Sequence, residues 1–353
     1  MEIETVLPLG KVDPGLRKPE QSLDLTTVGT DAQRVESLGY DRLLASENKE
    51  DPFVTIAVAA ERTTRLKLGT SVVIAFARSP AVTAMFAWSM QKLSRGRFTL
   101  GLGSQVRAHI QRRFGIKDYT PAGTWMREYV QAVRAYWDCW QNGTPLDFHG
   151  ARYEINLMVP QFNPGPIAQP AIPVHIAGVN PFMAQVAGEV ADVLGPHPIC
   201  TRAYIEQVML PAVAKGAKKA GRDPSEIGVA MRSLIATGPD EATLAGRVEA
   251  VRARIAFYAS TPGYRAVFAH HGLEALAKDL SVLSRAQRWE EMPPLIDDDM
   301  LQMFAVIGTY DQIVERMRAR CGGLATSAEF SIPVTSEADY ERLGDLITQL
   351  KKL

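Results

Sequence analysis

The chain has 353 residues, 46% of them hydrophobic and 22% charged, so it can bury a large core without help from disulfides. It contains 39 lysines and arginines and 39 aspartates and glutamates, which leaves a formal net charge of zero. A neutral chain concentrates no field of one sign, so we expect no nucleic-acid partner and no membrane partner. The three cysteines are far apart and have no metal-ligand spacing, which is typical of a reducing compartment and predicts no metal site.

The N-terminal segment MEIETVLPLG contains neither a basic stretch nor a long apolar one, so we expect no signal peptide. The apolar run at 72–77 is much shorter than the ~20 residues that a membrane-spanning helix needs. The sequence therefore predicts a cytoplasmic protein.

Short β-branched segments alternate with longer amphipathic segments along the chain. The short segments predict eight strands, at residues 3–9, 40–46, 66–74, 98–103, 174–177, 191–194, 227–237 and 327–332. The longer segments predict helices at 23–38, 51–62, 79–94, 125–141, 181–190, 202–220, 240–258, 310–320 and 337–353. Segment 142–173, which is rich in glycine and proline, and the polar segment 261–308 are expected to be irregular insertions.

Eight strands separated by helices predict a (β/α)8 TIM barrel, formed by residues 1–353 as one domain, with insertions after strands 4 and 7. A doubly wound sheet is the alternative, but the glycine-rich turn that usually follows its first strand is not found after residues 3–9. The chemistry of a barrel lies at the carboxyl ends of its strands. These ends are expected at residues 46–51, 71–76, 103–109, 177–180, 195–200 and 232–238.

Glycines at two of these strand ends are candidates for ligand binding. Gly101 and Gly103 allow the backbone to approach a flat or anionic ligand, and they could equally form a tight turn. Gly178 comes just before a helix, where exposed backbone N–H groups favour an anion such as phosphate. The alternative there is an ordinary loop in which Asn180 caps the helix.

Titratable side chains follow two other strands. Glu47 lies in the polar cluster 46–51 and is the carboxylate that we expect to point inward, where it could act as a general acid or base. Asp51 in the same cluster is more simply the cap of the next helix. His197 stands between two prolines and is either a ligand-binding group or a loop anchor.

His109 follows the fourth strand and is surrounded by three arginines, Arg107, Arg112 and Arg113. They form either the solvated face of a helix or a rim that binds an anionic cofactor tail. No HExxH, CxxC or Walker motif occurs, so zinc hydrolysis and nucleotide triphosphate chemistry have no support.

Five segments resemble the bacterial luciferase-like superfamily, in sequence and in order. They read LGTSVVI at 68–74, RSP at 78–80, LSRGRFTLGLG at 93–103, PVHIAG at 173–178 and AGEVAD at 187–192. Within the superfamily, residues 101–105, His109 and residues 112–115 are most similar to a branch of actinobacterial proteins that is assigned to the deazaflavin coenzyme F420 rather than to FMN.

The resemblance implies a barrel with a flavin-type ring at its C-terminal mouth. It implies a non-prolyl cis peptide at Ser71–Val72 against the ring, contacts of Ser104 with the polar edge of the ring, and a cofactor phosphate at Gly178 and Val179. In total, these residues are expected to bind the cofactor: Ser46, Ser71, Val72, Ser104, Gln105, Ala177, Gly178, Val179 and His197.

Glu47 is the first candidate for proton transfer or substrate positioning, and His109 is the second. Asn48 stands where luciferases and the F420-dependent sugar-phosphate dehydrogenases have a histidine, and it would supply hydrogen bonds without exchanging a proton. Val106 replaces a catalytic glutamate of these dehydrogenases, and Ser104 replaces an arginine of luciferase. We therefore expect neither sugar-phosphate dehydrogenation nor light emission.

These features predict an F420-dependent oxidoreductase that performs two-electron hydride transfer on a small organic substrate. The alternative is an FMNH2-dependent monooxygenase that inserts one atom of O2. The three arginines near the mouth favour F420, because its acidic tail carries more negative charge than the FMN phosphate. A third hypothesis is a barrel that binds a ligand without catalysis.

The resemblance also implies a homodimer through the second and third helices. Four residues there offer small and aromatic contacts: Ala84, Phe86, Ala87 and Trp88. The same residues could instead face the barrel.

Overall fold

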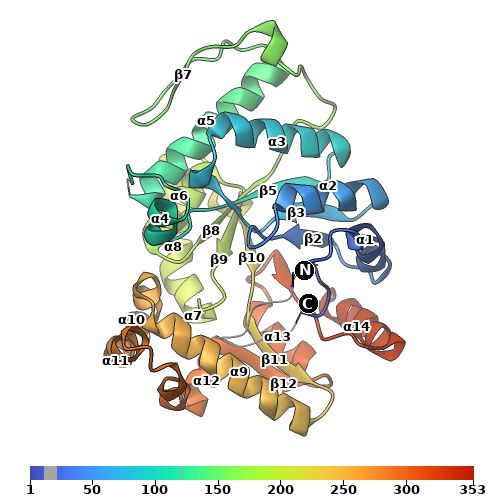
Figure 1. Cartoon of the computed structure of the whole chain (residues 1–353), viewed down its shortest axis with the longest axis vertical. Helices are drawn as coiled ribbons and strands as arrows, with labels where there is room; N and C mark the ends of the chain where they lie inside the picture. The colour runs from blue at the N-terminus through green and yellow to red at the C-terminus, as the bar shows by residue number, and fades with distance from the viewer. Residues whose placement is uncertain (12–21, 120) are drawn as a thin grey trace.

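The computed structural model describes residues 1–11, 22–119 and 121–353, which form a closed barrel of parallel strands (Figure 1). Within these ranges the barrel strands are, in order around the barrel, β1 (Glu2–Val6), β2 (Arg42–Ala45), β3 (Lys67–Thr70), β5 (Phe98–Gly103), β8 (Val174–Gly178), β9 (Val193–Pro196), β10 (Gly228–Met231) and β13 (Ser327–Glu329). The barrel closes because β1 pairs with both β2 and β13, while β3 pairs with β5. The predicted (β/α)8 TIM barrel is confirmed.

The barrel strands form where apolar residues follow one another without alternation. Every residue of β5 is buried, because the barrel interior covers one face of the strand and helices cover the other. Beyond β3 the chain continues as β4 (Val73–Ile74), which pairs with the end of β5. The carboxyl ends of β3 and β5 therefore lie together at one end of the barrel.

Helices surround the barrel: α1 (Val28–Ser37), α2 (Pro52–Arg62), α3 (Pro80–Leu93), α5 (Ala122–Asn142), α6 (Pro181–Val190), α8 (Leu210–Lys219), α13 (Ile313–Cys321) and α14 (Glu337–Leu350). The short α4 (Arg107–Arg112) follows β5, and α7 (Arg202–Tyr204) leads into α8 through a π-helical turn at Ile205–Met209. Asp51 and Asn180 cap α2 and α6 as expected, since each side chain accepts a backbone N–H of the first turn.

Most of the residues of α3 that the sequence offered for a dimer interface are buried within the protein. Ala84 and Ala87 are fully buried, and Trp88 is 1% exposed. Phe86 is 38% exposed and stacks on Phe53 of α2 with ring centroids 4.8 Å apart. Of the four residues, Phe86 is thus the one that reaches the outer surface.

The insertion after the seventh barrel strand differs from the prediction. The expected strand 227–237 is two strands, because the chain leaves the barrel after β10 and continues as β11 (Leu234–Gly238), which pairs with β12 (Ala305–Thr309). Between them lie α9 (Glu241–Ser260), α10 (Arg265–His270), α11 (Glu274–Arg285) and α12 (Asp298–Phe304). The prediction that 261–308 is irregular was wrong. Its helices are short and separated by proline and glycine, and they are stabilised by burying apolar side chains such as Phe268, Leu280 and Phe304.

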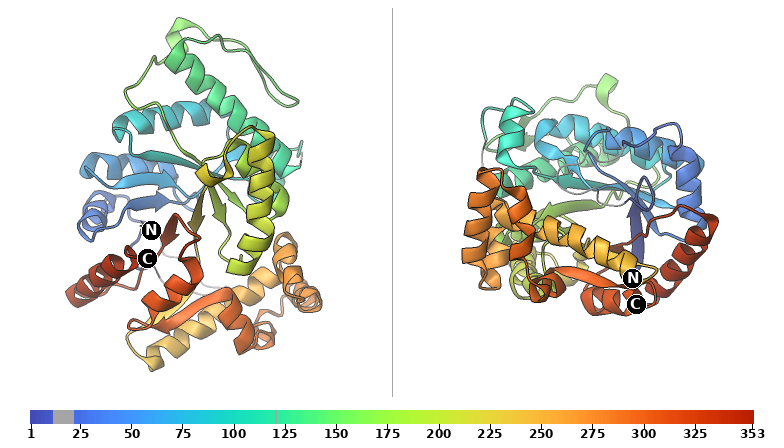
Figure 2. Two further views of the ribbon diagram at one scale, coloured as in Figure 1. Left: turned by 180° about the vertical axis from the view of Figure 1, so that it is seen from behind. Right: turned by 60° about the horizontal axis from the view of Figure 1, so that its bottom comes forward.

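The other insertion, residues 142–173, has little regular structure, as predicted. It contains a small hairpin of β6 (Phe148–His149) and β7 (Glu154–Ile155). This arm and the α9–α12 insertion lie at opposite ends of the long axis of the molecule (Figure 2). In the part of the chain that the structure describes, no helix has the length and apolar character to cross a membrane.

Helices α6 and α8 approach each other closely through two glycines. A Cβ on Gly188 would lie 2.1 Å from the carbonyl oxygen of Val213, and a Cβ on Gly216 would lie 1.9 Å from that of Gln185. Backbone atoms cannot yield to such contacts as a flexible side chain can, so the two helices depend on glycine at both positions.

We expect Gly188→Ala and Gly216→Ala each to lower the free energy of unfolding by about 2 kcal/mol, because the helices must move apart. Gly246→Ala on α9 is the matched control, since a Cβ there meets nothing within 4 Å. It is expected to stabilise by roughly 0.4–1 kcal/mol. Chemical denaturation followed by circular dichroism measures all three, and similar effects at the three positions would contradict the close approach.

Candidate active site

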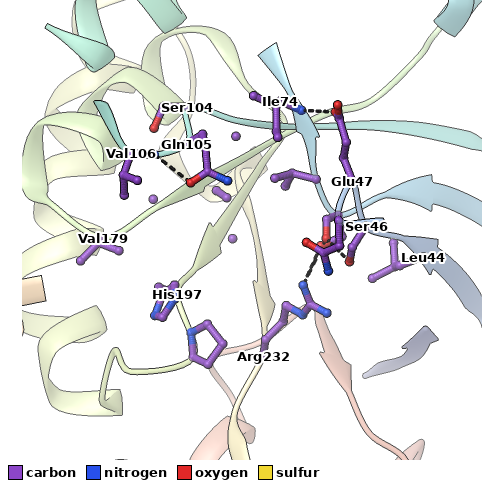
Figure 3. A pocket seen from close by; sticks show the side chains of 18 of the residues that line it. Leu44, Ser46, Glu47, Ile74, Ser104, Gln105, Val106, Val179, His197 and Arg232 are labelled. Atoms are coloured by element: carbon purple, nitrogen blue, oxygen red, sulfur yellow. Dashed lines mark hydrogen bonds between the residues drawn. The ribbon is translucent and has the colours of Figure 1, made fainter. Parts of the chain in front are cut away.

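A cavity of about 1130 Å³ opens at the carboxyl ends of the barrel strands (Figure 3). Residues from the barrel strand ends and from α9 and the segment that follows it line this cavity. Of the predicted site residues, the cavity brings together these: Ser46, Glu47, Asn48, Ser71, Val72, Ser104, Gln105, Ala177, Gly178, Val179 and His197. The strand ends that the sequence indicated therefore meet in one place.

His109 is not brought to this cavity. It lies exposed on α4 and is not among the lining residues, although its neighbours Val106 and Arg107 are. Arg112 and Arg113 also lie outside the lining. The exposed Arg107 at the start of α4 does line the cavity, so the distance of His109 from β5 along the sequence did not indicate which residues of this short helix reach the cavity.

The peptide bond between Ser71 and Val72 is cis, at the place that the resemblance implied. The end of β2 holds this segment through several hydrogen bonds. The N–H of Ser71 donates to Ala45 O at 2.8 Å, and Ser46 Oγ donates to Ser71 O at 2.8 Å. The N–H of Glu47 donates to Val72 O at 3.2 Å. The last residue of β2 and the two residues after it therefore fix both sides of the cis peptide.

The glycines of β5 make room for the same segment. A Cβ on Gly101 would lie 1.8 Å from Thr70 O, and a Cβ on Gly103 would lie 2.4 Å from Val72 Cγ2. The structure gives these glycines a third role, which the sequence did not indicate. These glycines accommodate the neighbouring strand and so set the position of Val72 in the cavity wall.

Glu47 is already fully engaged by groups of the protein. Arg78 Nη1 donates to both carboxylate oxygens, at 2.7 and 2.6 Å, and the N–H of Ile74 donates to Oε2 at 2.7 Å. The side chains of Glu47 and Arg78 are only 12% and 16% exposed. Both carboxylate oxygens are engaged by donors of the segment after the cis peptide, so this geometry favours a role of Glu47 in positioning that segment.

The start of α6 presents backbone donors to the cavity. Within the described residues, the N–H groups of Val179 and Asn180 donate to no protein acceptor. The loop is held in place by Tyr204, whose hydroxyl donates to Val179 O at 3.0 Å, and by the N–H of His197, which donates to Gly178 O at 3.1 Å. Open N–H groups at the N-terminus of a helix form a site for an anion such as phosphate.

His197 is a neutral hydrogen-bond donor in the cavity wall. Its Nδ1 accepts the N–H of Ile199 at 3.3 Å, which assigns the proton to Nε2. Its ring stacks on Tyr264 at 4.4 Å and meets the edge of Tyr258 at 4.7 Å. Burial, together with the positive charge of Arg232, lowers the pKa of His197 to about 3, so the imidazole stays uncharged near neutral pH.

His175 and Arg232 also line the cavity, and the sequence did not single them out. His175 lies within β8 and is 7% exposed, and its buried Nε2 has no hydrogen-bond partner in the described part of the chain. Gly195 provides the space for it, since a Cβ there would lie 1.9 Å from Nε2. Burial lowers the pKa of His175 to about 3. An unpaired polar atom at this depth is expected to meet a ligand or water.

One part of the cavity lining, called the floor below, consists of His175, Arg232 and Glu329. Arg232 Nη2 lies 2.5 Å from Glu329 Oε2, and Arg232 Nη1 donates to both Ser71 O and Ser71 Oγ at 3.3 Å. The sequence did not indicate Arg232 as a site residue, although it is the first residue of the predicted strand end 232–238, because an arginine at such a position is equally typical of the protein surface. Figure 3 shows its side chain directed toward Ser46.

Among the described residues that line the cavity, which exclude 12–21 and 120, cations outnumber carboxylates. The cations are Lys11, Lys49, Arg107, Arg232 and Arg254, and the carboxylates are Glu47, Glu50 and Glu329. Glu47 is in addition neutralised by Arg78, which lies behind it. The cavity therefore suits a ligand with negative charge. Across the described residues, no group of three or more His, Cys, Asp or Glu side chains is placed to hold a metal ion.

Comparison with known proteins agrees with this architecture. Residues 5–327 match the luciferase-like monooxygenase family, and the chain belongs to this family. It is 41% identical over 321 residues to an uncharacterized protein from Mycobacterium tuberculosis, covering 91% of this chain and 93% of that protein.

Two further matches are to proteins with named activities. A putative coenzyme F420-dependent oxidoreductase from Mycobacterium tuberculosis is 25% identical, with 94% of this chain and 95% of that protein covered. The structure of the coenzyme F420-dependent tetrahydromethanopterin reductase from Methanopyrus kandleri shares the fold, with a TM-score of 0.75, 21% identity and coverage of 98% and 97% of the two chains. The resemblance to the luciferase-like superfamily, and to its F420-dependent branch, is confirmed.

The low pKa of His175 predicts acid sensitivity. The folded protein binds this proton only near pH 3, whereas the unfolded chain binds it near the usual 6.5, so stability falls as the pH drops from 6.5 toward 3 and is unaffected above that window. Between pH 7 and pH 5, wild type is expected to lose about 2 kcal/mol more unfolding free energy than His175→Gln. Denaturant titrations at the two pH values measure the difference.

His149→Gln is the control for this comparison, because the His149 side chain is 58% exposed. It is expected to keep the pH dependence of wild type. Equal pH dependence in wild type and His175→Gln would show that burial of His175 does not suppress its protonation.

Proposed function

We propose that this protein is an oxidoreductase that uses the deazaflavin F420 for two-electron hydride transfer on a small organic substrate. The observation that carries the proposal is the set of unsatisfied groups facing one cavity: the amides of Val179 and Asn180 at its wall and Nε2 of His175 at its floor. A phosphate-bearing ring compound would satisfy donors at both places.

The residues present fit such a cofactor. The start of α6 would hold its phosphate at Val179 and Asn180, and Val72 with the cis peptide would contact the ring. When bound, the deazaflavin supplies the two-electron chemistry, accepting or donating a hydride. Ser104 and Gln105 lie at the end of β5 in the same cavity, where their polar groups would face the edge of the ring.

The chain's own residues would position the ligands and exclude water. Ser46 and Glu47 hold the cis peptide in place, so that Val72 presents a fixed surface. His197 offers a neutral N–H donor whose direction is set by Ile199 and by the stacked Tyr264. Such a fixed donor can hold an oxygen of the cofactor or of the substrate without exchanging a proton near neutral pH.

Charge supports F420 over FMN. Both cofactors carry a phosphate, and the excess of cations around the cavity suits the longer acidic tail of F420. Arg107 contributes to this excess, whereas Arg112 and Arg113 lie outside the cavity. The second candidate function is an FMNH2-dependent monooxygenase, which the family as a whole supports through its description.

Titration of the purified protein with oxidised F420 and, separately, with FMN tests the proposal. Binding is measured by the quenching of tryptophan fluorescence and by the visible absorption of the cofactor. We expect F420 to bind at micromolar concentration and FMN to bind much more weakly. The reverse preference would favour the monooxygenase, which oxygen consumption would then test. Binding of neither cofactor would contradict the proposal.

Asn180 allows a sharper test of the phosphate site. Asn180→Asp keeps a good helix cap but places a negative charge beside the proposed phosphate, so we expect F420 binding to weaken by about tenfold or more. Asn180→Ser also caps the helix and adds no charge, and it is expected to bind within about threefold of wild type. Equal affinities for the two variants would argue against a phosphate at this place.

We also propose that the protein forms a homodimer through α2 and α3. These helices expose four apolar side chains, Val54 (48%), Val82 (38%), Met85 (54%) and Phe86 (38%). Met85→Glu is expected to shift sedimentation from dimer to monomer, because dimerisation would bury the new charge. Val282→Glu, on an exposed side chain (52%) of α11, is the control that should leave the dimer unchanged. A monomeric wild type would contradict the proposal.

A further inference from the structure

Arg232 connects three parts of the barrel mouth. It stands where β10 ends and the chain leaves the barrel toward β11. Its guanidinium donates to Ser71 O and Oγ at 3.3 Å on one side and lies 2.5 Å from Glu329 Oε2 at the end of β13 on the other. Ser71, whose carbonyl belongs to the cis peptide, thus accepts hydrogen bonds from the Arg232 guanidinium, which stands just after β10.

The two histidines near Arg232 carry no charge near pH 7. Burial, together with the positive charge of Arg232 and, for His175, of Arg42, lowers the pKa of His175 and His197 to about 3. Glu47 is paired with Arg78 at 2.6 Å. Arg232 therefore keeps a permanent positive charge at the floor, and Glu329 balances it.

Reduction changes the charge of a flavin-type ring. A hydride brings two electrons and one proton, so the ring becomes more negative by one charge unless a second proton follows. The neutral histidines are poor sources of that proton near neutral pH. A fixed cation in a partly buried site stabilises the added charge, and its effect is larger there than in water.

We propose that Arg232 makes this cavity bind the reduced cofactor more tightly than the oxidised cofactor. Arg232 does this as a fixed charge at the floor, held in place by Ser71 and Glu329. The inference rests on the proposed function, because it requires a ring of this kind in the cavity. It assigns to this chain a residue that sets the direction in which hydride transfer is favoured.

The test compares two variants that both lack the balancing carboxylate, Glu329→Gln and the double variant Arg232→Met with Glu329→Gln. Each folded variant and wild type is titrated with oxidised F420 and with reduced F420 at one fixed pH. The measured quantity is the ratio of the Kd for the oxidised form to the Kd for the reduced form. We expect this ratio to fall by about tenfold or more, ~1.4 kcal/mol, when Arg232 is removed.

Two further measurements separate charge from shape. Arg232→Lys with Glu329→Gln keeps the charge, so its ratio should stay within about threefold of that of Glu329→Gln. Glu329→Gln alone should raise the ratio above that of wild type, because the cation is then unbalanced. This second comparison holds even if the methionine variant does not fold.

The outcomes distinguish the two proposals. If wild type binds both forms of F420 and the ratio is the same in all variants, the inference about Arg232 is overturned while the proposed function stands. Equal loss of affinity for both forms in the methionine variant also overturns it, since Arg232 would then only shape the site. If wild type binds neither form of F420, both proposals fail.

Discussion

The hydrogen bonds between the end of β2 and the Ser71–Val72 segment are the constraint on which the site depends. Three successive residues take part, the last residue of β2 through Ala45 O and the two that follow it through Ser46 Oγ and the N–H of Glu47. Such a set is possible because parallel strands in a closed barrel bring their carboxyl ends to the same height, so residues far apart in sequence meet as neighbours. The same geometry places the glycines of β5 against this segment. Any ligand in the cavity therefore meets a wall whose backbone is fixed by adjacent strands.

Electrostatics divides the cavity into regions with different chemistry. Backbone N–H groups at the start of α6 offer partial positive charge without a side chain, at a position that suits phosphate. Burial keeps His175 and His197 neutral, so they can exchange hydrogen bonds but not protons near neutral pH. Arg232 carries a full charge at the floor, balanced by Glu329. A cofactor with a phosphate and a redox-active ring would use all three regions, which is why the proposals concern charge and position more than acid–base catalysis.

The sequence predicted the position of the site better than the roles of its residues. The cluster at 46–51 and the loop at 177–180 were expected at strand ends, and both line the cavity. The role of Glu47 could not be predicted, because its partner Arg78 is remote in sequence and the ion pair exists only once β2 and the segment after β4 are adjacent. His109 is not among the residues that line the cavity for a related reason, since packing decides which residues of a short helix face a cavity and their distance from the preceding strand does not. That Nε2 of His175 is buried without a hydrogen-bond partner in the described part of the chain could be recognised only from the structure.

The sequence by itself determined the fold and the family. Alternation of apolar strands and amphipathic helices is a local property, and the segments that resemble the luciferase-like proteins are contiguous. The helical character of 261–308 and the division of strand 227–237 were decided by tertiary structure, because short helices and a strand that leaves the barrel are stabilised by burial against distant elements. The charge states in the cavity were also decided there. Burial and the proximity of Arg232 set the pKa of the histidines, and both arise only when eight separate strand ends converge on one cavity.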